Sequence, residues 1–414
     1  MANYFVSDLY LQDEIASAPT SEYPQNYFRV QDHSSLITVL PDFAECLSSN
    51  IVPTEVVSFP GWAKATAPDE FGHEWVAVTY GNGLYVVVAD DYDYTESPAG
   101  QIATSPDGIN WTLRTHPGAE VFECYTVDWI ETLGLFIIGG YMTDDSFNIL
   151  TSPDGITWTA RQTGLGPDGG ALNAAVHSLT WSESLGRLLV SNWWGTLLHY
   201  SDDGINWTAV TAEQAPGNYW SYFGFSAIAY SETAGVFCAA GYQMDWCITS
   251  PDGINWTEHR PAEISSFQGF KMAWSPTANL FAFFGEAGDN TGPIYTSPDG
   301  INWTYRPLDF TVVTNDGDAD PFLPCYGSRY NSVLDKFEMV TSGDNNWPGF
   351  FTTPPVYILE SSDGITWDAT PDIPGMHDYG YGVLSVSEFR DTANKSATEK
   401  VLVGLRGIFY STTT

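Results

Sequence analysis

Apolar residues recur along this chain at a fixed spacing, with a short polar turn between them. An aromatic residue near the end of one apolar run is followed seven positions later by another apolar residue, and a polar turn such as Glu-Thr-Leu-Gly at 131–134 lies between them. A β-rich run, a variable loop and two further short runs complete each unit. This pattern predicts four antiparallel strands per unit. The pairs are Trp129 with Phe136, Trp181 with Leu188, Tyr230 with Phe237, Trp274 with Phe281, Tyr330 with Phe337 and, more tightly spaced, Tyr80 with Tyr85.

One motif separates the last two runs of each unit. Residues 104–112 read TSPDGINWT, and close variants occur at 151–159, 201–208, 249–257, 296–304 and 361–367. A short motif that returns about every fifty residues indicates a repeat architecture. The spacings are 47, 49, 49, 47 and 64 residues between the tryptophans Trp111, Trp158, Trp207, Trp256, Trp303 and Trp367.

The motif has the chemistry of a tight hairpin. Pro106 fixes the φ angle that the second position of a type I turn requires, and the Asp107 carboxylate can accept hydrogen bonds from nearby backbone N–H groups. Gly108 supplies a positive φ that closes the turn, and Trp111 is large enough to pack between sheets. We therefore interpret the repeated aspartates as turn-stabilising rather than catalytic. They are Asp107, Asp154, Asp203, Asp252, Asp299 and Asp363.

The motif resembles the Asp box, the bacterial neuraminidase repeat of sialidase-like β-propellers. It is a variant, because the usual box has one residue between the aspartate and the glycine, and here the two are adjacent in all six copies. The resemblance covers about residues 51–414 and implies a propeller fold. It implies no particular activity, since Asp boxes occur in enzymes, receptors and assembly factors alike.

We predict an all-β fold: a seven-bladed β-propeller over residues 51–414, preceded by a short N-terminal arm over residues 1–50. After the sixth motif, three further strands are expected. We expect residues 54–59 to complete that last blade, because ring closure removes exposed sheet edges. A cut at residue 50 should then be tolerated, and a cut at residue 62 should not.

Charge narrows the classes of partner. The chain has 14 Lys and Arg against 51 Asp and Glu, a net charge of -37. A field of this sign repels phosphate backbones, so no nucleic-acid partner is expected. No signal peptide is visible at the N-terminus, and no stretch approaches the length of a membrane span, so no membrane insertion is expected.

The five cysteines show no metal-ligand spacing. Cys124 and Cys325 occupy the same repeat position, which predicts a small buried strand residue. Cys238 and Cys247 flank a predicted hairpin. We favour two free thiols there, with a cross-strand disulfide as the alternative.

Irregular sequence falls in the loops between second and third strands and in the connections between blades, which share one face of a propeller. Aromatic rings flanked by Asn and Asp suit sugar recognition, because ring faces stack on pyranose C–H surfaces while amides bind hydroxyls. The alternative is that these rings fill the blade tops or an oligomer interface. The ligand-binding candidates are Trp193, Trp194, Tyr219, Trp220, Tyr222, Trp246 and Trp347.

One acidic loop is a candidate cation site. Asp316, Asp318 and Asp320 alternate along it, and Ca²⁺ prefers several oxygen ligands. The loop lacks the later glycine and glutamate of an EF-hand, and a solvated acidic loop is the alternative.

The arginines do not follow the sialidase pattern. That family binds its substrate carboxylate with an arginine triad, whereas four of the nine arginines here follow a motif tryptophan by three or four residues and are expected to be structural. No Arg-Ile-Pro motif is present. The four are Arg114, Arg161, Arg260 and Arg306.

The near-identical motifs, the separate arm and the aromatic, lysine-poor propeller resemble bacteriophage virion proteins in their general organisation. Our leading hypothesis is a non-enzymatic virion fibre, spike or decoration protein, made in the host cytoplasm. Its arm would dock to other virion proteins or form a homo-oligomer, and its propeller would bind a host-surface glycan or stabilise the particle. The alternatives are an Asp-box glycoside hydrolase or depolymerase, and an intracellular assembly-factor propeller.

Overall fold

The chain folds almost entirely as β-strands. The computed structural model describes residues 58–412 apart from 60–61, 66–73, 91–101, 118–121, 143–147, 164–174, 193–197, 212–223, 242–245, 263–266, 288–293, 308–311, 314–318, 321–324, 343–355, 370–388, 395–398 and 405–406. The expected arm at 1–50 lies outside the described residues, and its boundary stays a prediction. Among the described residues, no helix is long and apolar enough to cross a bilayer.

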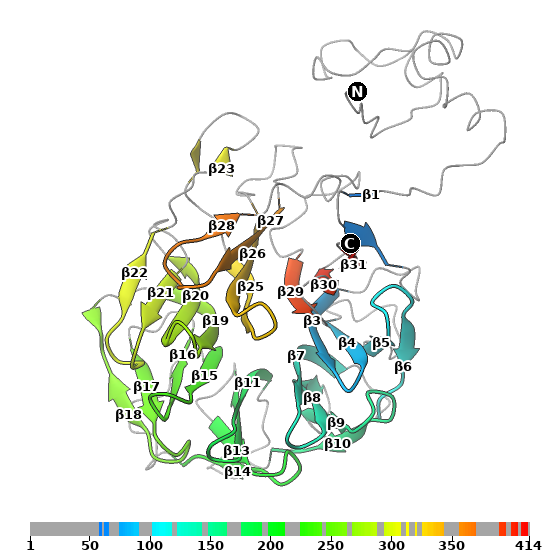
Figure 1. Ribbon diagram of the computed structural model, residues 1–414. Helices are drawn as coiled ribbons and strands as arrows, with labels where there is room; N and C mark the ends of the chain where they lie inside the picture. The colour runs from blue at the N-terminus through cyan, green and yellow to red at the C-terminus, as the bar shows by residue number, and fades with distance from the viewer. Residues whose placement is uncertain are drawn as a thin grey trace, which may run out of the picture. The chain divides into compact units, whose positions relative to one another are not determined.

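Six sheets are regular four-stranded blades, arranged in chain order around a central axis (Figure 1). In each, the first strand is innermost and the fourth is outermost. The first three blades are β3 (Glu74–Gly81), β4 (Leu84–Asp90), β5 (Ile102–Ser105) and β6 (Thr112–Arg114); β7 (Phe122–Ile130), β8 (Leu135–Met142), β9 (Ile149–Ser152) and β10 (Thr159–Arg161); and β11 (Val176–Ser182), β12 (Arg187–Asn192), β13 (Leu198–Ser201) and β14 (Thr208–Ala209).

The next three blades follow the same plan. They are β15 (Ala227–Ser231), β16 (Val236–Ala240), β17 (Cys247–Ser250) and β18 (Thr257–His259); β19 (Phe267–Ser275), β20 (Leu280–Ala287), β21 (Ile294–Ser297) and β22 (Thr304–Arg306); and β25 (Cys325–Asn331), β26 (Lys336–Ser342), β27 (Val356–Ser361) and β28 (Asp368–Ala369). A two-stranded ribbon, β23 (Val312–Val313) with β24 (Ala319–Asp320), lies between the fifth and sixth in sequence.

The prediction of seven blades is wrong, because the described residues form six regular blades. The remaining sheet has five strands drawn from both ends, in the order β1 (Ser58–Phe59), β2 (Trp62–Lys64), β31 (Gly407–Thr412), β30 (Glu399–Gly404) and β29 (Phe389–Asn394). Its strand β29 lies on the axis with the innermost strands of the blades (Figure 1).

The N-terminal strand that joins this sheet is also displaced from its predicted place. We expected residues 54–59, but β2 pairs with β31, and β1 pairs only with β2. Phe59 pairs with Trp62 in the antiparallel ladder of β1 and β2, and the Pro-Gly dipeptide between them in the sequence is typical of tight turns. Directly after β2, Ala65 is buried and donates its N–H to the Ile408 carbonyl (2.8 Å), which extends the contact with β31.

The predicted aromatic pairs are direct cross-strand partners of the first and second strands. Trp129 pairs with Phe136, and their ring centroids lie 4.5 Å apart. Tyr230 and Phe237 do the same at 4.4 Å. Such pairs stabilise a sheet from both strands at once, which explains their recurrence.

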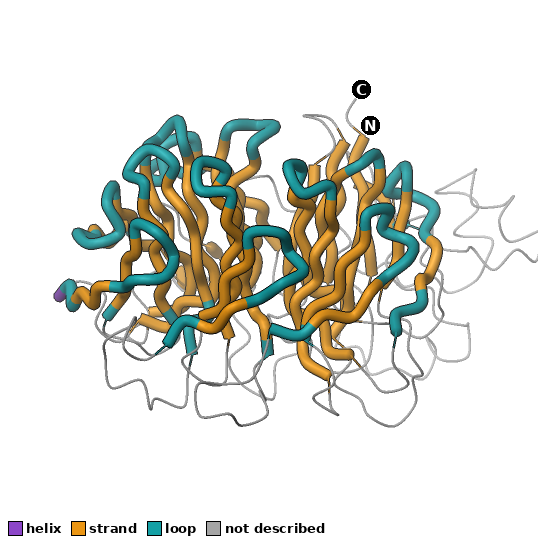
Figure 2. Tube along the Cα trace, turned by 90° about the horizontal axis from the view of Figure 1, so that it is seen from below, coloured by secondary structure: helices purple, strands orange, loops and turns teal. Residues whose placement is uncertain are grey.

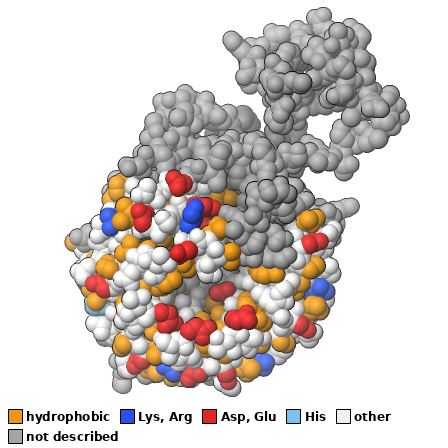
Figure 3. All heavy atoms as spheres, viewed as in Figure 1, with side chains coloured by type: hydrophobic (Ala, Val, Ile, Leu, Met, Phe, Trp, Pro, Cys, Tyr) orange, Lys and Arg blue, Asp and Glu red, His pale blue; other side chains and the backbone are white. Residues whose placement is uncertain are grey.

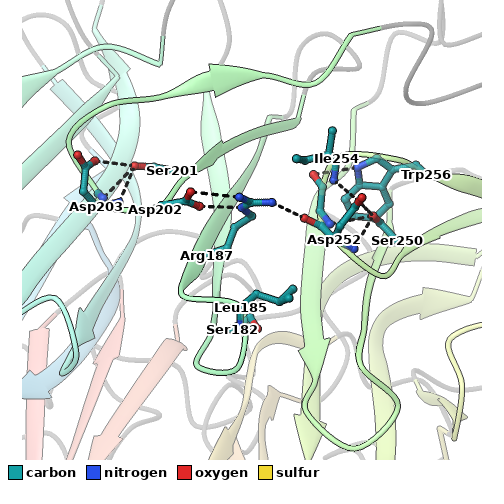
Figure 4. Close-up of polar contacts among 12 residues, drawn as sticks. Ser182, Leu185, Arg187, Ser201, Asp202, Asp203, Ser250, Asp252, Ile254 and Trp256 are labelled. Carbon is teal, nitrogen blue, oxygen red and sulfur yellow. Dashed lines mark hydrogen bonds and ion pairs between the residues drawn. The ribbon is translucent and has the colours of Figure 1, made fainter.

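Each motif folds into the same turn, here called the repeat turn (residues 105–111 and their five equivalents). In the fourth blade, Ser250 Oγ donates to Asp252 Oδ1 (2.9 Å), and the N–H of Gly253 donates to Ser250 Oγ (2.8 Å). The backbone N–H groups of Ile254 and Asn255 both donate to Asp252 Oδ1 at 2.8 Å (Figure 4). All six repeat turns share this set of bonds, and their glycines have φ between 68° and 74°.

The repeat turn also holds neighbouring blades together. A Cβ on Gly253 would lie 2.7 Å from the Leu189 Cδ1 of the preceding blade, so glycine is needed for close approach as well as for its φ. Arg187 adds a polar link: its Nε donates to Asp202 Oδ1 (2.7 Å) and its Nη1 to the Asp252 carbonyl (2.8 Å), which connects the turns of the third and fourth blades (Figure 4).

The cysteines whose side chains are described are free and buried. The thiols of Cys238 and Cys247 both donate to the Gly300 carbonyl, at 3.6 and 3.3 Å. Burial raises the pKa of Cys238 well above its usual value, and the neighbouring Cys247 adds to the rise. Two free thiols are therefore present, as the sequence favoured.

Candidate functional site

The two ends of the ring differ in character. Because strands alternate in direction, the repeat turns and the first hairpin turns lie at one face, here called the repeat-turn face, and the described turns gather there in Figure 2. Asp and Glu side chains surround the centre of this face in Figure 3. Two glutamates of the first hairpin turns join blades: Glu183 accepts from Thr132 Oγ1 at 2.5 Å, and Glu232 accepts from the Glu183 N–H at 2.7 Å. We therefore regard them as structural.

A second feature lies on the axis. Six of the innermost strands contain one residue more than their partner strand opposes, which is a β-bulge. The extra residue falls at the same repeat position, four before the last aromatic of the strand in five of the six cases. These bulge positions are Val76, Tyr125, His177, Phe270, Tyr326 and Arg390.

The bulges lie near the end of the ring opposite the repeat turns. Each innermost strand runs from that end toward its hairpin turn, and the bulge comes within the first four residues of the strand. Bulges re-aim side chains and occur beside functional sites more often than elsewhere in sheets. In this chain the bulge positions are occupied by aliphatic, aromatic, histidine and arginine residues.

Tyr125 and His177 form the best-defined part of this site. Their rings stack, with centroids 4.1 Å apart and planes 15° from parallel, although they belong to neighbouring blades. The Tyr125 hydroxyl donates to Glu123 Oε2 at 2.5 Å, and Glu123 is buried. The Glu123 carboxylate therefore holds the Tyr125 ring in place. The rings of Tyr125 and His177 are both half-buried.

The protonation state of His177 determines the charge of the stacked pair. Desolvation, followed by the positive charge of Lys271, lowers the pKa of His177 to about 3. His177 is thus a neutral ring at physiological pH, and it stacks on the ring of Tyr125. Together the two rings can stack on a ligand, and the imidazole can accept or donate hydrogen bonds.

The sequence analysis did not identify Tyr125 and His177 as site residues. The available signal was the repeat itself: aligned on the aromatic pairs, the bulge positions of five innermost strands fall in one column, which holds Val, Tyr, His, Phe and Tyr. Tyr125 and His177 lie about fifty positions apart in the chain, and the packing of the second blade against the third brings them together.

Most of the predicted aromatic loop residues lie outside the described part of the chain. Trp246 is described: it is half-buried and packs edge to face on Phe225, with centroids 5.4 Å apart. The Trp246 ring therefore has a packing role, through its contact with Phe225. Trp193, Trp194, Tyr219, Trp220, Tyr222 and Trp347 lie outside the described residues, so their role stays a prediction.

The acidic-loop cation site also stays a prediction. Asp316 and Asp318 lie outside the described residues, and Asp320 is described only as the backbone of β24. In the part of the chain that the structure describes, no group of three or more His, Cys, Asp or Glu side chains is arranged to hold a metal ion.

The motif arginines act locally in three of four cases. Arg114, Arg161 and Arg306 each donate through Nε to a threonine hydroxyl of the third strand, at 2.8, 3.2 and 2.9 Å. Arg260 differs, because it lies one position later and contacts Glu258 at 2.6 Å. His259 takes the place of the arginine there, with its Nε2 2.8 Å from Thr249 Oγ1.

No protein-family model and no curated protein sequence matches this chain. Solved structures do resemble it. A structure of YCF48 bound to a D1 peptide is similar over 87% of this chain and 97% of that one, with a TM-score of 0.54 and 16% identity. An ancestral GH74 enzyme matches over 83% of this chain and 45% of its own, with a TM-score of 0.56 and 12% identity.

The WD40 β-propeller domain of Doa1 covers 86% of this chain and 98% of its own, with a TM-score of 0.53 and 11% identity. At such identities the likenesses show the fold alone. The chain is an all-β propeller, and its structural neighbours include an enzyme and a WD40 domain, so the fold by itself does not select a function.

Proposed function

We propose that this chain is a non-enzymatic recognition protein of a virion: a fibre, spike or decoration protein that binds a host-surface glycan through its propeller and docks to other virion proteins through residues 1–50. The observation that carries the recognition part is the axial site. Six innermost strands carry a bulge near the same end of the ring, and at two of these positions Tyr125 and His177 present stacked, half-buried rings.

Stacked aromatic rings beside polar groups are the usual means of holding a sugar. The stack lies near the end of the ring where the strands lead into the irregular loops, so those loops would extend the same binding surface. Three features of the sequence support the virion assignment. They are the resemblance of the repeat turn to the Asp box, the separate arm and the acidic, lysine-poor composition.

A binding role fits the described side chains better than catalysis does. The motif arginines described above are engaged within their own blades, and the repeat-turn carboxylates accept backbone hydrogen bonds. An acid–base pair for glycoside hydrolysis needs two carboxyl groups facing one another across a substrate, and the axial site described here offers Glu123 alone.

The test is a glycan array with the full chain, run beside Tyr125→Ala and the loop variant Trp193→Ala/Trp194→Ala/Trp220→Ala. Ile156→Ala, which alters an exposed residue of a repeat turn (48% exposed), is the matched control. We expect binding that both aromatic variants lose and Ile156→Ala keeps. Release of reducing sugar from bound polysaccharide would instead establish the hydrolase, and co-purification with a membrane complex would establish the assembly factor.

A further inference from the structure

The exposed large hydrophobic side chains of the described residues all lie in turns of the repeat-turn face. Four of them follow the glycine of a repeat turn, and two lie in the first hairpin turns of the third and sixth blades. Each is between 38% and 49% exposed, and all are aliphatic. Apolar surface is therefore repeated around this face. The six residues are Ile156, Leu185, Ile205, Ile301, Val333 and Ile365.

The hydrogen bonds of the repeat turn do not require these isoleucines. In the second blade, Ile156 contributes only its backbone N–H, which donates to Asp154 Oδ1 (2.9 Å), and any residue except proline could make that bond. Turn positions usually carry Gly, Pro, Asn, Asp or Ser, yet all six repeat turns carry isoleucine here, four exposed and two, Ile109 and Ile254, half-buried. A single exposed aliphatic residue is ordinary, but its return around one face favours a contact surface.

Carboxylates accompany these aliphatic side chains. Asp154 and Asp203 are exposed in two of the same repeat turns, and hydrophobic side chains lie among Asp and Glu side chains across this face in Figure 3. Backbone hydrogen bonds from Thr157 and Ile156 lower the pKa of Asp154 below its usual value, so this carboxylate stays ionised at physiological pH. A second copy of the face would bring like charges together, and aliphatic side chains lack the ring faces that stack on sugars. A basic protein surface fits both the charge and the apolar character.

We propose that the repeat-turn face docks a basic protein surface, with the exposed aliphatic side chains in apolar contact and the carboxylates paired with lysines and arginines of the partner. Residues 1–50 of this chain, with one arginine and no lysine, do not provide such a surface. The stack of Tyr125 on His177 lies near the other end of the ring, so a protein bound at the repeat turns leaves the proposed glycan site open. This inference goes beyond the proposed function and does not depend on it.

The test is fluorescence anisotropy of a labelled amphipathic peptide of leucine and lysine, titrated with the full chain. The salt concentration is about 0.15 M, at which long-range attraction between exposed charges is screened. We expect binding to this peptide, much weaker binding to oligolysine, which offers charge alone, and none to a peptide of leucine and glutamate, whose charge has the wrong sign.

Two fourfold variants locate the contact. Ile156→Thr/Ile205→Thr/Ile301→Thr/Ile365→Thr should bind the leucine–lysine peptide about tenfold or more weakly, because it removes apolar contact area and no charge. The matched control changes four exposed residues of outer strands and should bind like the wild type; it is Thr159→Ala/Thr208→Ala/Thr257→Ala/Thr304→Ala. Tyr125→Ala, at the other end of the ring, should also bind like the wild type. Melting temperatures of all variants are compared with that of the wild type, and if the fourfold isoleucine variant melts lower, Ile156→Thr/Ile205→Thr replaces it, with an expected loss of about threefold or more.

Four results would overturn the inference. They are no binding of the leucine–lysine peptide, equal binding of that peptide and oligolysine, equal affinity of the wild type and the isoleucine variant, and loss of peptide binding in Tyr125→Ala, which would place the peptide at the axial site. The glycan array is read separately, because the isoleucine variant should keep any glycan binding that Tyr125→Ala loses. A failure of peptide docking therefore leaves the proposed recognition function standing, and the reverse also holds.

Discussion

Stability of this protein in mild acid should depend in part on the buried imidazole of His199. His199 lies on β13 with no exposed surface, and its Nε2 has no hydrogen-bond partner, while Asn192 Nδ2 lies 3.4 Å from its Nδ1. Desolvation lowers the pKa of His199 from 6.5 to about 4. The folded protein thus keeps this ring neutral in a pH range where the unfolded chain protonates it.

The magnitude follows from that difference. Between pH 6.5 and pH 4, His199 is protonated in the unfolded state but neutral in the folded state. The free energy of unfolding therefore falls as the pH drops through this range, by about 1.4 kcal/mol per pH unit at most. Between pH 7 and pH 5 the loss attributable to His199 is about 2 kcal/mol. The repeat-turn aspartates do not titrate in this window, because their hydrogen bonds hold the pKa of each below the usual 3.8.

The assay is urea unfolding of the wild type and of His199→Leu at pH 7, 6 and 5. At pH 7 the two should differ by no more than about 1 kcal/mol, since the variant removes an unpartnered buried nitrogen but also a weak contact to Asn192. From pH 7 to pH 5 the wild type should lose about 2 kcal/mol more of its free energy of unfolding than His199→Leu does. Both proteins should keep a residual slope from His177. Parallel pH profiles for the two would refute the reasoning.

Three further perturbations test the fold. Ser250→Ala should lower the free energy of unfolding by about 1–3 kcal/mol, because the buried N–H of Gly253 loses its acceptor; urea unfolding at pH 7 measures this, and an unchanged midpoint would contradict it. Gly253→Ala should cost about 2 kcal/mol or more, since it combines a φ of 73° with a contact to Leu189. Gly186→Ala, with φ 58° and open space, should cost about 1 kcal/mol, and equal losses would refute the packing argument. A chain that begins at residue 66 lacks β2 and the Ala65 hydrogen bond to β31, so it should be less stable by about 3 kcal/mol in the same assay, whereas a chain that begins at residue 51 should unfold like the full protein.

Features set by neighbouring residues could be predicted well. The repeat turn needs serine, aspartate and glycine within four positions, and each predicted aspartate lies in such a turn. The strand pairs of each first hairpin also followed from the spacing of aromatic residues. These interactions close over a few residues, so their chemistry can be read along the chain.

Features that join distant segments were misplaced or missed. The closing strand was expected at residues 54–59, but residues 62–64 pair with β31, because the pairing depends on contacts with a strand more than 340 residues away in the chain. The number of regular blades is six, since the last sheet borrows strands from both ends. Arg260 was assigned the place that His259 fills, because a one-residue offset changes the side of the strand from which the side chain projects.

By itself, then, the sequence determined the repeat, the turn chemistry and the all-β propeller class, because hydrogen bonds within each repeat turn and between adjacent strands satisfy the local backbone wherever the repeat occurs. Tertiary structure decided what stands at the axis. Tyr125 and His177 come from two neighbouring blades, and each is the bulge residue of its innermost strand. Register and ring closure are collective properties of strands far apart in the chain, so no local pattern of residues encodes them.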